Sequence, residues 1–175
     1  LHKVTIIPRG QAMGATFSLP EKDRYGFGQK YIDATMRVLC GGRIAEKRKT
    51  EDITSGASMD IRMATGYARH MILEWGMSEK LGFVDYTPTG EQDAWATEKV
   101  YSEQTAHVVD GEVKRLVDEA YQSAQQTIDE HWDQVIAIAE ALLKYETLSF
   151  DEVDRLMKGE KLVKSTISDL LEAEQ

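Results

Sequence analysis

The feature that most constrains the fold is a long run of apolar residues at helical spacing in the C-terminal half. From Ser102 onward, apolar side chains recur every three or four residues, which places them on one face of a helix. The members are Val109, Val113, Leu116, Val117, Ala120, Tyr121, Ala124, Ile128, Trp132, Val135, Ile136, Ala139, Leu142 and Leu143. One long helix and two stacked helices both satisfy this pattern. Ser149 and Glu152 then have capping-box spacing ahead of a short last helix that ends near Gly159.

A second helical pattern follows the turn Thr54-Ser55-Gly56 and runs to Trp75, before Gly76. Its apolar residues are Ile61, Ala64, Ala68, Met71, Ile72 and Trp75. The turn delivers Asp60 into the first turn of this helix, where free N–H groups and the helix dipole favour a carboxylate. We therefore expect Asp60 to be ionised and held by nearby N–H groups.

A third helix is predicted from Lys30 to about Arg48. Its apolar face is expected to contain Tyr31, Ala34, Val38 and Ala45. The pair Gly41-Gly42 lies inside this helix, where glycine costs stability, so a close backbone contact is the expected reason for it. The segment from about Phe83 to Lys99 contains Pro88 and Gly90 and has no sustained period, which predicts a long loop.

Only the first twenty residues are typical of β structure. Val4 to Ile7 are rich in β-branched side chains, Pro8 ends the run, and a second short extended run covers Ala15 to Leu19. A short antiparallel pair is predicted. The fold class is therefore mainly α, with a small N-terminal antiparallel β element.

Composition excludes some functions. The 175-residue chain carries a formal charge of −9, which argues against a nucleic-acid partner, because such binding depends on clustered Lys and Arg. Cys40 is the only cysteine, so no internal disulfide can form and a reducing compartment is expected. No apolar run has the length of a membrane span and no signal-peptide pattern is present, so the chain as given is expected to be soluble.

A metal site cannot be assembled from the sequence pattern alone. Histidines that share a zinc ion from one helix stand four residues apart with a glutamate between them, as in HExxH. His2, His70, His107 and His131 are scattered, and no two have that spacing. His70 and Glu74 do have helical i, i+4 spacing, but such a pair is expected to be a surface salt bridge or hydrogen bond.

Several sequence segments resemble motifs of one family and occur in the same order as in that family. They are Lys-Val-Thr-Ile-Ile-Pro-Arg-Gly (3 to 10), Leu-Pro-Glu-Lys-Asp-Arg (19 to 24), Leu-Cys-Gly-Gly-Arg-Ile-Ala-Glu (39 to 46), Thr-Ser-Gly-Ala-Ser-Met-Asp-Ile (54 to 61), Ala-Arg-His-Met-Ile-Leu-Glu-Trp-Gly-Met-Ser-Glu-Lys-Leu-Gly (68 to 82), Ser-Glu-Gln-Thr-Ala (102 to 106), Val-Asp-Gly-Glu-Val (109 to 113) and Ala-Leu-Leu-Lys-Tyr-Glu-Thr-Leu (141 to 148). Together they resemble the FtsH family, the membrane-anchored AAA+ zinc metalloproteases. One departure is Phe83, where members usually have proline.

The resemblance implies a site that is only partly contained in this chain. By position, Asp60 would be the third zinc ligand, completing a site begun by two histidines of an HExxH helix that lies upstream of Leu1. The catalytic glutamate would lie upstream too, so no catalytic residue is assigned in this chain. Substrate would lie along the unpaired edge of the first strand, at Val4, Thr5, Ile6 and Ile7. Glu46 is interpreted as a solvated helix residue rather than a ligand; the alternatives are a carboxylate that supports a metal ligand without binding the metal, and a structural carboxylate.

The resemblance also implies cofactors, partners and location. Zinc would serve the peptidase, and ATP with magnesium would serve an upstream ATPase module. Substrates would be unfolded or membrane polypeptides, and the assembly would be a homo-oligomer, expected to be a hexamer. The chain would be a soluble domain on the cytoplasmic side, or in an organelle matrix or stroma, of a protein anchored to the membrane only through segments outside this chain.

The domain boundaries follow the extent of the resemblance. Residues 1–160 are expected to form the C-terminal part of a zinc metallopeptidase domain, and residues 161–175 a polar tail. Because no HExxH and no phosphate-binding loop occur, three origins stay open: part of an intact protease, a natural fragment, or a homologue that has lost its histidines. The last would be a non-catalytic structural or interaction subunit of a hexameric ring. We favour the intact protease, because Asp60 is in place.

Overall fold

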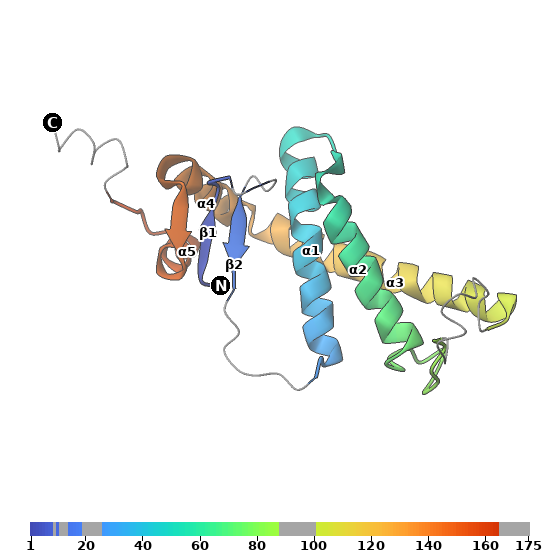
Figure 1. The fold of residues 1–175 in the computed structure, drawn as a ribbon. Helices are drawn as coiled ribbons and strands as arrows, with labels where there is room; N and C mark the ends of the chain where they lie inside the picture. The colour runs from blue at the N-terminus through green and yellow to red at the C-terminus, as the bar shows by residue number, and fades with distance from the viewer. Residues whose placement is uncertain (9, 11–13, 19–25, 88–100, 165–175) are drawn as a thin grey trace. The chain divides into compact units, whose positions relative to one another are not determined.

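The computed structural model describes residues 1–8, 10, 14–18, 26–87 and 101–164 (Figure 1). Its elements are β1 (Lys3–Thr5), β2 (Ala15–Phe17), α1 (Gln29–Thr50), η1 (Ser55–Ala57), α2 (Ser58–Leu73), α3 (Glu103–Glu130), α4 (Trp132–Tyr145), β3 (Thr147–Ser149) and α5 (Phe150–Met157). The predicted fold class, mainly α with a small antiparallel sheet, is confirmed. The segment 19–24, residues 88–99 of the predicted loop and the tail beyond residue 164 lie outside the described residues.

The chain divides into two compact units. A helical unit consists of residues 25–129, and a sheet unit combines residues 1–24 with residues 130–175. Asp60 belongs to the helical unit, whereas the four residues expected to dock substrate belong to the sheet unit. Whether residues 1–160 act as one domain stays a prediction.

In the helical unit, α1 and α2 run antiparallel and side by side (Figure 1). Their apolar faces share one core with α3. Its buried members are Ile32, Met36, Ala64, Ala68, Met71, Ile72, Leu81, Val109, Leu116 and Ala120. The face predicted for α2 is therefore confirmed except at its start, where Ile61 is exposed. Gly76 follows the helix with φ of 57°, a conformation that favours glycine.

The face predicted for α1 is wrong. The buried residues are Ile32, Met36, Cys40 and Ile44, whereas Val38 is 77% exposed and Tyr31 is 41% exposed. Both sets of residues recur at steps of three and four, so spacing alone does not choose between them. The buried residues form one continuous i, i+4 row, and that row packs against α2 and α3.

The close contact expected at the glycine pair is also absent among the described residues. A Cβ at Gly41 would meet only Ile128 Cδ1, at 3.9 Å, and a Cβ at Gly42 would meet no atom within 4 Å. Gly42→Ala is therefore expected to stabilise α1 by about 0.5–1 kcal/mol, because alanine loses less conformational entropy in a helix. Thermal unfolding of the chain measures this change.

Gly14→Ala is the matched control for that experiment. A Cβ at Gly14 would lie 2.6 Å from the Thr5 carbonyl oxygen, closer than such contacts allow, so the same substitution should destabilise the chain. If Gly42→Ala also lowers the unfolding temperature, the conclusion that Gly42 has no close neighbour is wrong.

The sheet of the sheet unit has the strand order β2-β1-β3, with antiparallel pairing throughout. The predicted pair of strands is confirmed, in the register Lys3↔Phe17 and Thr5↔Ala15. The third strand was not predicted. It pairs Thr5 with Thr147 and Lys3 with Ser149, and Leu148 at its centre is fully buried.

This topology corrects the expectation of an unpaired edge at the first strand. Val4 and Thr5 are paired on both sides, with β2 and with β3. The N–H of Ile6 donates to the Glu146 carbonyl at 2.9 Å, and the N–H of Ile7 donates to the Thr5 hydroxyl at 3.2 Å. A substrate strand therefore cannot add to β1 at these residues without displacing a neighbour. A role of the exposed Ile6 and Ile7 side chains in substrate binding stays a prediction.

The long C-terminal apolar pattern forms two helices, which meet at His131. The capping box predicted before the last helix is confirmed. The Ser149 hydroxyl accepts from the Glu152 N–H, and the Glu152 carboxylate accepts from the Ser149 N–H at 2.8 Å. This box fixes the start of α5, whose Val153 and Leu156 pack with Leu148.

Candidate functional site

Asp60 lies in the first turn of α2 as predicted, but the N–H groups of the described residues do not hold its carboxylate as expected. The N-cap position is Ala57, and no side chain caps α2. Among the described residues, no hydrogen bond or ion pair engages the Asp60 carboxylate, so the expected N–H contacts are not formed. Asp60 therefore does not act as the cap of its helix, and a half-buried carboxylate is left available for another partner.

The Asp60 carboxylate borders a cavity of about 280 Å³ that is lined mainly by apolar side chains of α1, α2 and α3. Its lining includes Leu39, Cys40, Val117 and Tyr121. Burial raises the pKa of the Cys40 thiol above its usual range, and the nearby negative charge of Asp60 raises it further. Cys40 is therefore a buried neutral thiol beside Asp60.

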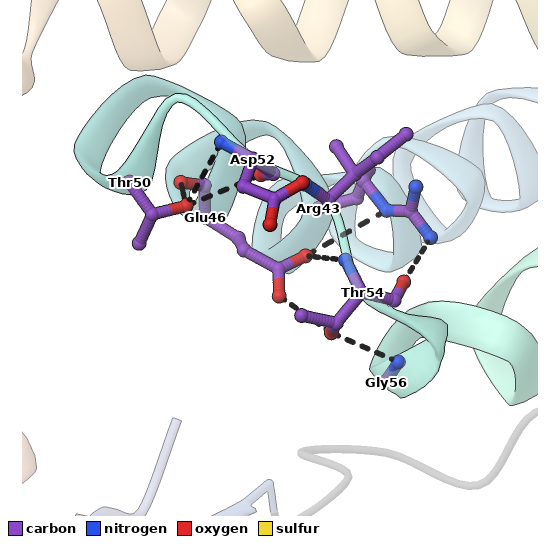
Figure 2. Close-up of polar contacts among 7 residues, drawn as sticks. Arg43, Glu46, Thr50, Asp52, Thr54 and Gly56 are labelled. Atoms are coloured by element: carbon purple, nitrogen blue, oxygen red, sulfur yellow. Dashed lines mark hydrogen bonds and ion pairs between the residues drawn. The ribbon is translucent and has the colours of Figure 1, made fainter.

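The turn that leads to Asp60 is fastened to α1 by a group we call the Glu46 clamp, made of Arg43, Glu46, Thr54 and Gly56 (Figure 2). Glu46 Oε1 accepts from the Thr54 hydroxyl at 2.6 Å, and Arg43 Nη2 donates to the Thr54 carbonyl at 2.8 Å. The interpretation of Glu46 as a merely solvated helix residue is thus wrong, and the structural alternative is correct. The i, i+3 spacing of Arg43 and Glu46 was the available signal.

A second polar cluster, which sequence reasoning missed, surrounds Glu112 on α3. This carboxylate is only 2% exposed. It accepts from Ser78 at 2.9 Å, from Lys80 at 2.8 Å and from two nitrogens of Arg115 at 3.0 and 2.9 Å. These donors, above all Arg115, lower the pKa of Glu112 to about 2 despite its burial. The cluster fastens the segment after α2 to α3.

The histidines do not form a metal site within the described part of the chain. His70 Nδ1 lies 2.8 Å from Glu74 Oε1, so the predicted side-chain pair is confirmed. Within residues 1–87 and 101–164, apart from the gaps given above, no group of three or more His, Cys, Asp and Glu side chains is placed to bind a metal ion. A metal held by Asp60 would therefore need ligands from outside the described residues.

Comparison with known proteins covers almost the whole chain. The model of peptidase family M41 matches residues 1–156. The chain is 48% identical over 166 residues to a protein named ATP-dependent zinc metalloprotease FtsH 2 from Methylacidiphilum infernorum, which covers 93% of this chain and 26% of that protein. It is 42% identical over 168 residues to the ATP-dependent zinc metalloprotease YME1 homolog of Caenorhabditis elegans, covering 95% of this chain and 23% of that protein.

A third relative, named ATP-dependent zinc metalloprotease FtsH, from Haemophilus influenzae, is 42% identical over 91% of this chain. These matches place the chain in the metallopeptidase class. The chain belongs to peptidase family M41, the FtsH family of zinc metalloproteases. It spans about a quarter of the length of these relatives.

Among the residues that the model describes, no helix is both long and apolar enough to cross a bilayer.

Proposed function

We propose that this chain is the C-terminal part of the peptidase domain of an ATP-dependent zinc metalloprotease that degrades unfolded or membrane proteins. The HExxH helix and the AAA+ ATPase module, which uses ATP and magnesium, lie outside it. The observation that carries the proposal is the family match over residues 1–156 together with an Asp60 carboxylate that no described side chain engages. An aspartate without a structural partner has both carboxylate oxygens available to a metal ion.

The residues present fit zinc as one part of a shared site. Zinc in catalytic sites takes three protein ligands, drawn from His, Asp, Glu and Cys, and keeps a position open. Asp60 supplies one such ligand, beside a cavity of about 280 Å³. When bound, zinc lowers the pKa of a coordinated water and polarises the substrate carbonyl. The contribution of this chain is to hold the third ligand beside an apolar cavity wall.

We further propose that substrate docks on the sheet unit, outside β2 rather than on β1. A peptide strand can add only to an outer strand, and β1 is central. The opposite outer strand, β3, is partly covered. Lys164 donates to the Thr147 carbonyl at 3.0 Å, and Leu162 packs against the apolar cluster that contains Leu148. Binding through main-chain hydrogen bonds would suit a protease that takes unfolded chains of many sequences.

A proline scan of β2 tests this docking. Successive N–H groups of a strand point to opposite edges, so Ala15→Pro and Thr16→Pro remove donors on different sides. One variant should lower the unfolding temperature by breaking the pairing with β1. The other should keep the fold and depress hydrolysis of unfolded proteins several-fold at unchanged ATP hydrolysis. Docking outside β2 is excluded if neither variant separates hydrolysis from stability.

Self-association belongs to the same proposal. Hexameric rings that are anchored to a membrane through other segments would place six copies of this domain side by side. Light scattering on the protein with its upstream peptidase helix measures the assembly, and a monomer at high concentration would contradict it.

The function itself is tested by zinc removal and return in the full-length protein. Chelation should abolish ATP-dependent hydrolysis of an unfolded protein, and stoichiometric zinc should restore it. A full-length protein that assembles but neither binds zinc nor cleaves peptides would instead be the non-catalytic subunit.

A further inference from the structure

We propose that Glu46 is a positioning residue for the metal site. By its hydrogen bonds to Thr54 it fixes the turn before α2, and the position of this turn sets where the Asp60 carboxylate lies. This inference rests on the proposed function, because it takes Asp60 to be a zinc ligand. It assigns to the Glu46 clamp a task beyond holding two helices together, namely setting where the Asp60 carboxylate lies.

The clamp uses every polar group of Thr54 (Figure 2). Its hydroxyl donates to Glu46 Oε1 at 2.6 Å, and its N–H donates to Glu46 Oε2 at 3.4 Å. Its carbonyl accepts from Arg43 Nη2 at 2.8 Å, and Arg43 Nε lies 3.8 Å from Glu46 Oε2. One residue of the turn is thus held in three directions by two residues of α1.

The position of Thr54 passes directly to Asp60. The Thr54 hydroxyl accepts from the Gly56 N–H at 3.2 Å and so caps η1. The last residue of η1, Ala57, is buried and is also the N-cap position of α2. Continuous helical backbone therefore joins the clamp to Asp60, and a displacement of Thr54 shifts the start of α2.

Asp60 depends on this backbone because its carboxylate has no hydrogen bond or ion pair of its own among the described residues. A metal ligand must be held within about 0.5 Å of its productive position, usually by a supporting hydrogen bond. Here the support acts through the main chain. Glu46 itself is a poor candidate for a ligand, because both of its carboxylate oxygens already accept from Thr54.

The test uses the full-length protein with its upstream histidines. Zinc affinity is measured by competition with a chelator, and thermal unfolding is recorded for the same samples. Glu46→Ala removes the clamp from α1, and Thr54→Val removes the hydroxyl at nearly constant volume. Thr54→Ser keeps the hydroxyl and should rescue. Thr65→Val is the matched control, because the Thr65 hydroxyl donates to the Ile61 carbonyl of its own helix, away from the Glu46 clamp.

We expect Glu46→Ala and Thr54→Val to weaken zinc binding about 10- to 100-fold. Thr54→Ser and Thr65→Val should bind zinc as the wild type does, and added zinc should restore hydrolysis in Thr54→Val. If Glu46→Ala does not fold, the zinc affinities of Thr54→Val and Thr54→Ser decide whether the clamp supports the metal site.

Two results overturn the inference without touching the proposed function. One is wild-type zinc affinity in Glu46→Ala and Thr54→Val while Asp60→Asn has lost its zinc. The other is loss of zinc in Glu46→Gln as complete as in Asp60→Asn, which would make Glu46 a ligand itself. Wild-type zinc binding in Asp60→Asn would overturn the proposed function instead.

Discussion

Asp60→Asn in the full-length protein is expected to remove tightly bound zinc and to lower peptide hydrolysis by at least about 100-fold. Loss of a residue that hydrogen-bonds a metal ligand lowers metal affinity or activity by up to about 100-fold, and loss of the ligand itself has a larger effect. An amide is an uncharged and poorer donor to zinc than a carboxylate. Zinc content and ATP-dependent cleavage of an unfolded protein are the two measurements, and they should fall together.

The fold should be almost indifferent to this substitution. Because no hydrogen bond or ion pair among the described residues involves the Asp60 carboxylate, only its favourable interaction with the helix dipole is lost, about 0.3–1 kcal/mol. Asp110→Asn makes the same chemical change at an exposed position of α3 and should leave zinc and hydrolysis unchanged. The present chain alone should bind no zinc tightly in either form. Full activity in Asp60→Asn would show that the ligand is elsewhere.

Glu112→Gln is expected to have the largest effect on stability, and the effect should depend on pH. The folded-state pKa of about 2 lies below the ordinary value of 4.5. Ionisation of Glu112 therefore contributes stability above about pH 4.5, and that contribution is lost as the pH falls toward 2. A shift of this size corresponds to roughly 3 kcal/mol in the free energy of unfolding at neutral pH.

Denaturant unfolding at pH 7 and near pH 3 measures this difference. The gap between wild type and Glu112→Gln should be widest at pH 7 and should narrow in acid, because the wild-type carboxylate is then being protonated. Glu79→Gln is the matched control, since Glu79 is exposed in the same segment as Ser78 and Lys80. A gap that stays constant with pH would mean that packing, and not charge, accounts for the loss.

Local pattern was sufficient for some of these features. The burial of Ala64, Ala68 and Met71 follows from their spacing. The capping box depends only on residues 149–152, so it can be recognised from the local sequence. The position of Asp60 in the first turn of α2 was likewise predictable. What was not predictable from the turn residues is that Thr54 caps η1 and leaves the Asp60 carboxylate without a hydrogen bond.

The features that were missed depend on partners distant in sequence. Glu112 has the helical spacing of the buried face, between Val109 and Leu116, but a carboxylate is stable there only because Ser78, 34 residues away, and two cations donate to it. The strand β3 is three residues long, too short to show alternation, and forms because β1 is available to pair with it. Val38 and Ile32 lie on different faces of α1, and only the packing of α2 and α3 selects one of them.

The pairing of β1 with β3 has a consequence for synthesis on the ribosome. The Thr5 hydroxyl donates to the Glu146 carbonyl across a separation of 141 residues, and one side of β1 stays open until residues 147–149 have emerged. The helical unit, residues 25–129, is complete earlier and can fold first. A nascent chain that stalls before Thr147 would present the bare edge of β1 as a template for pairing with other chains.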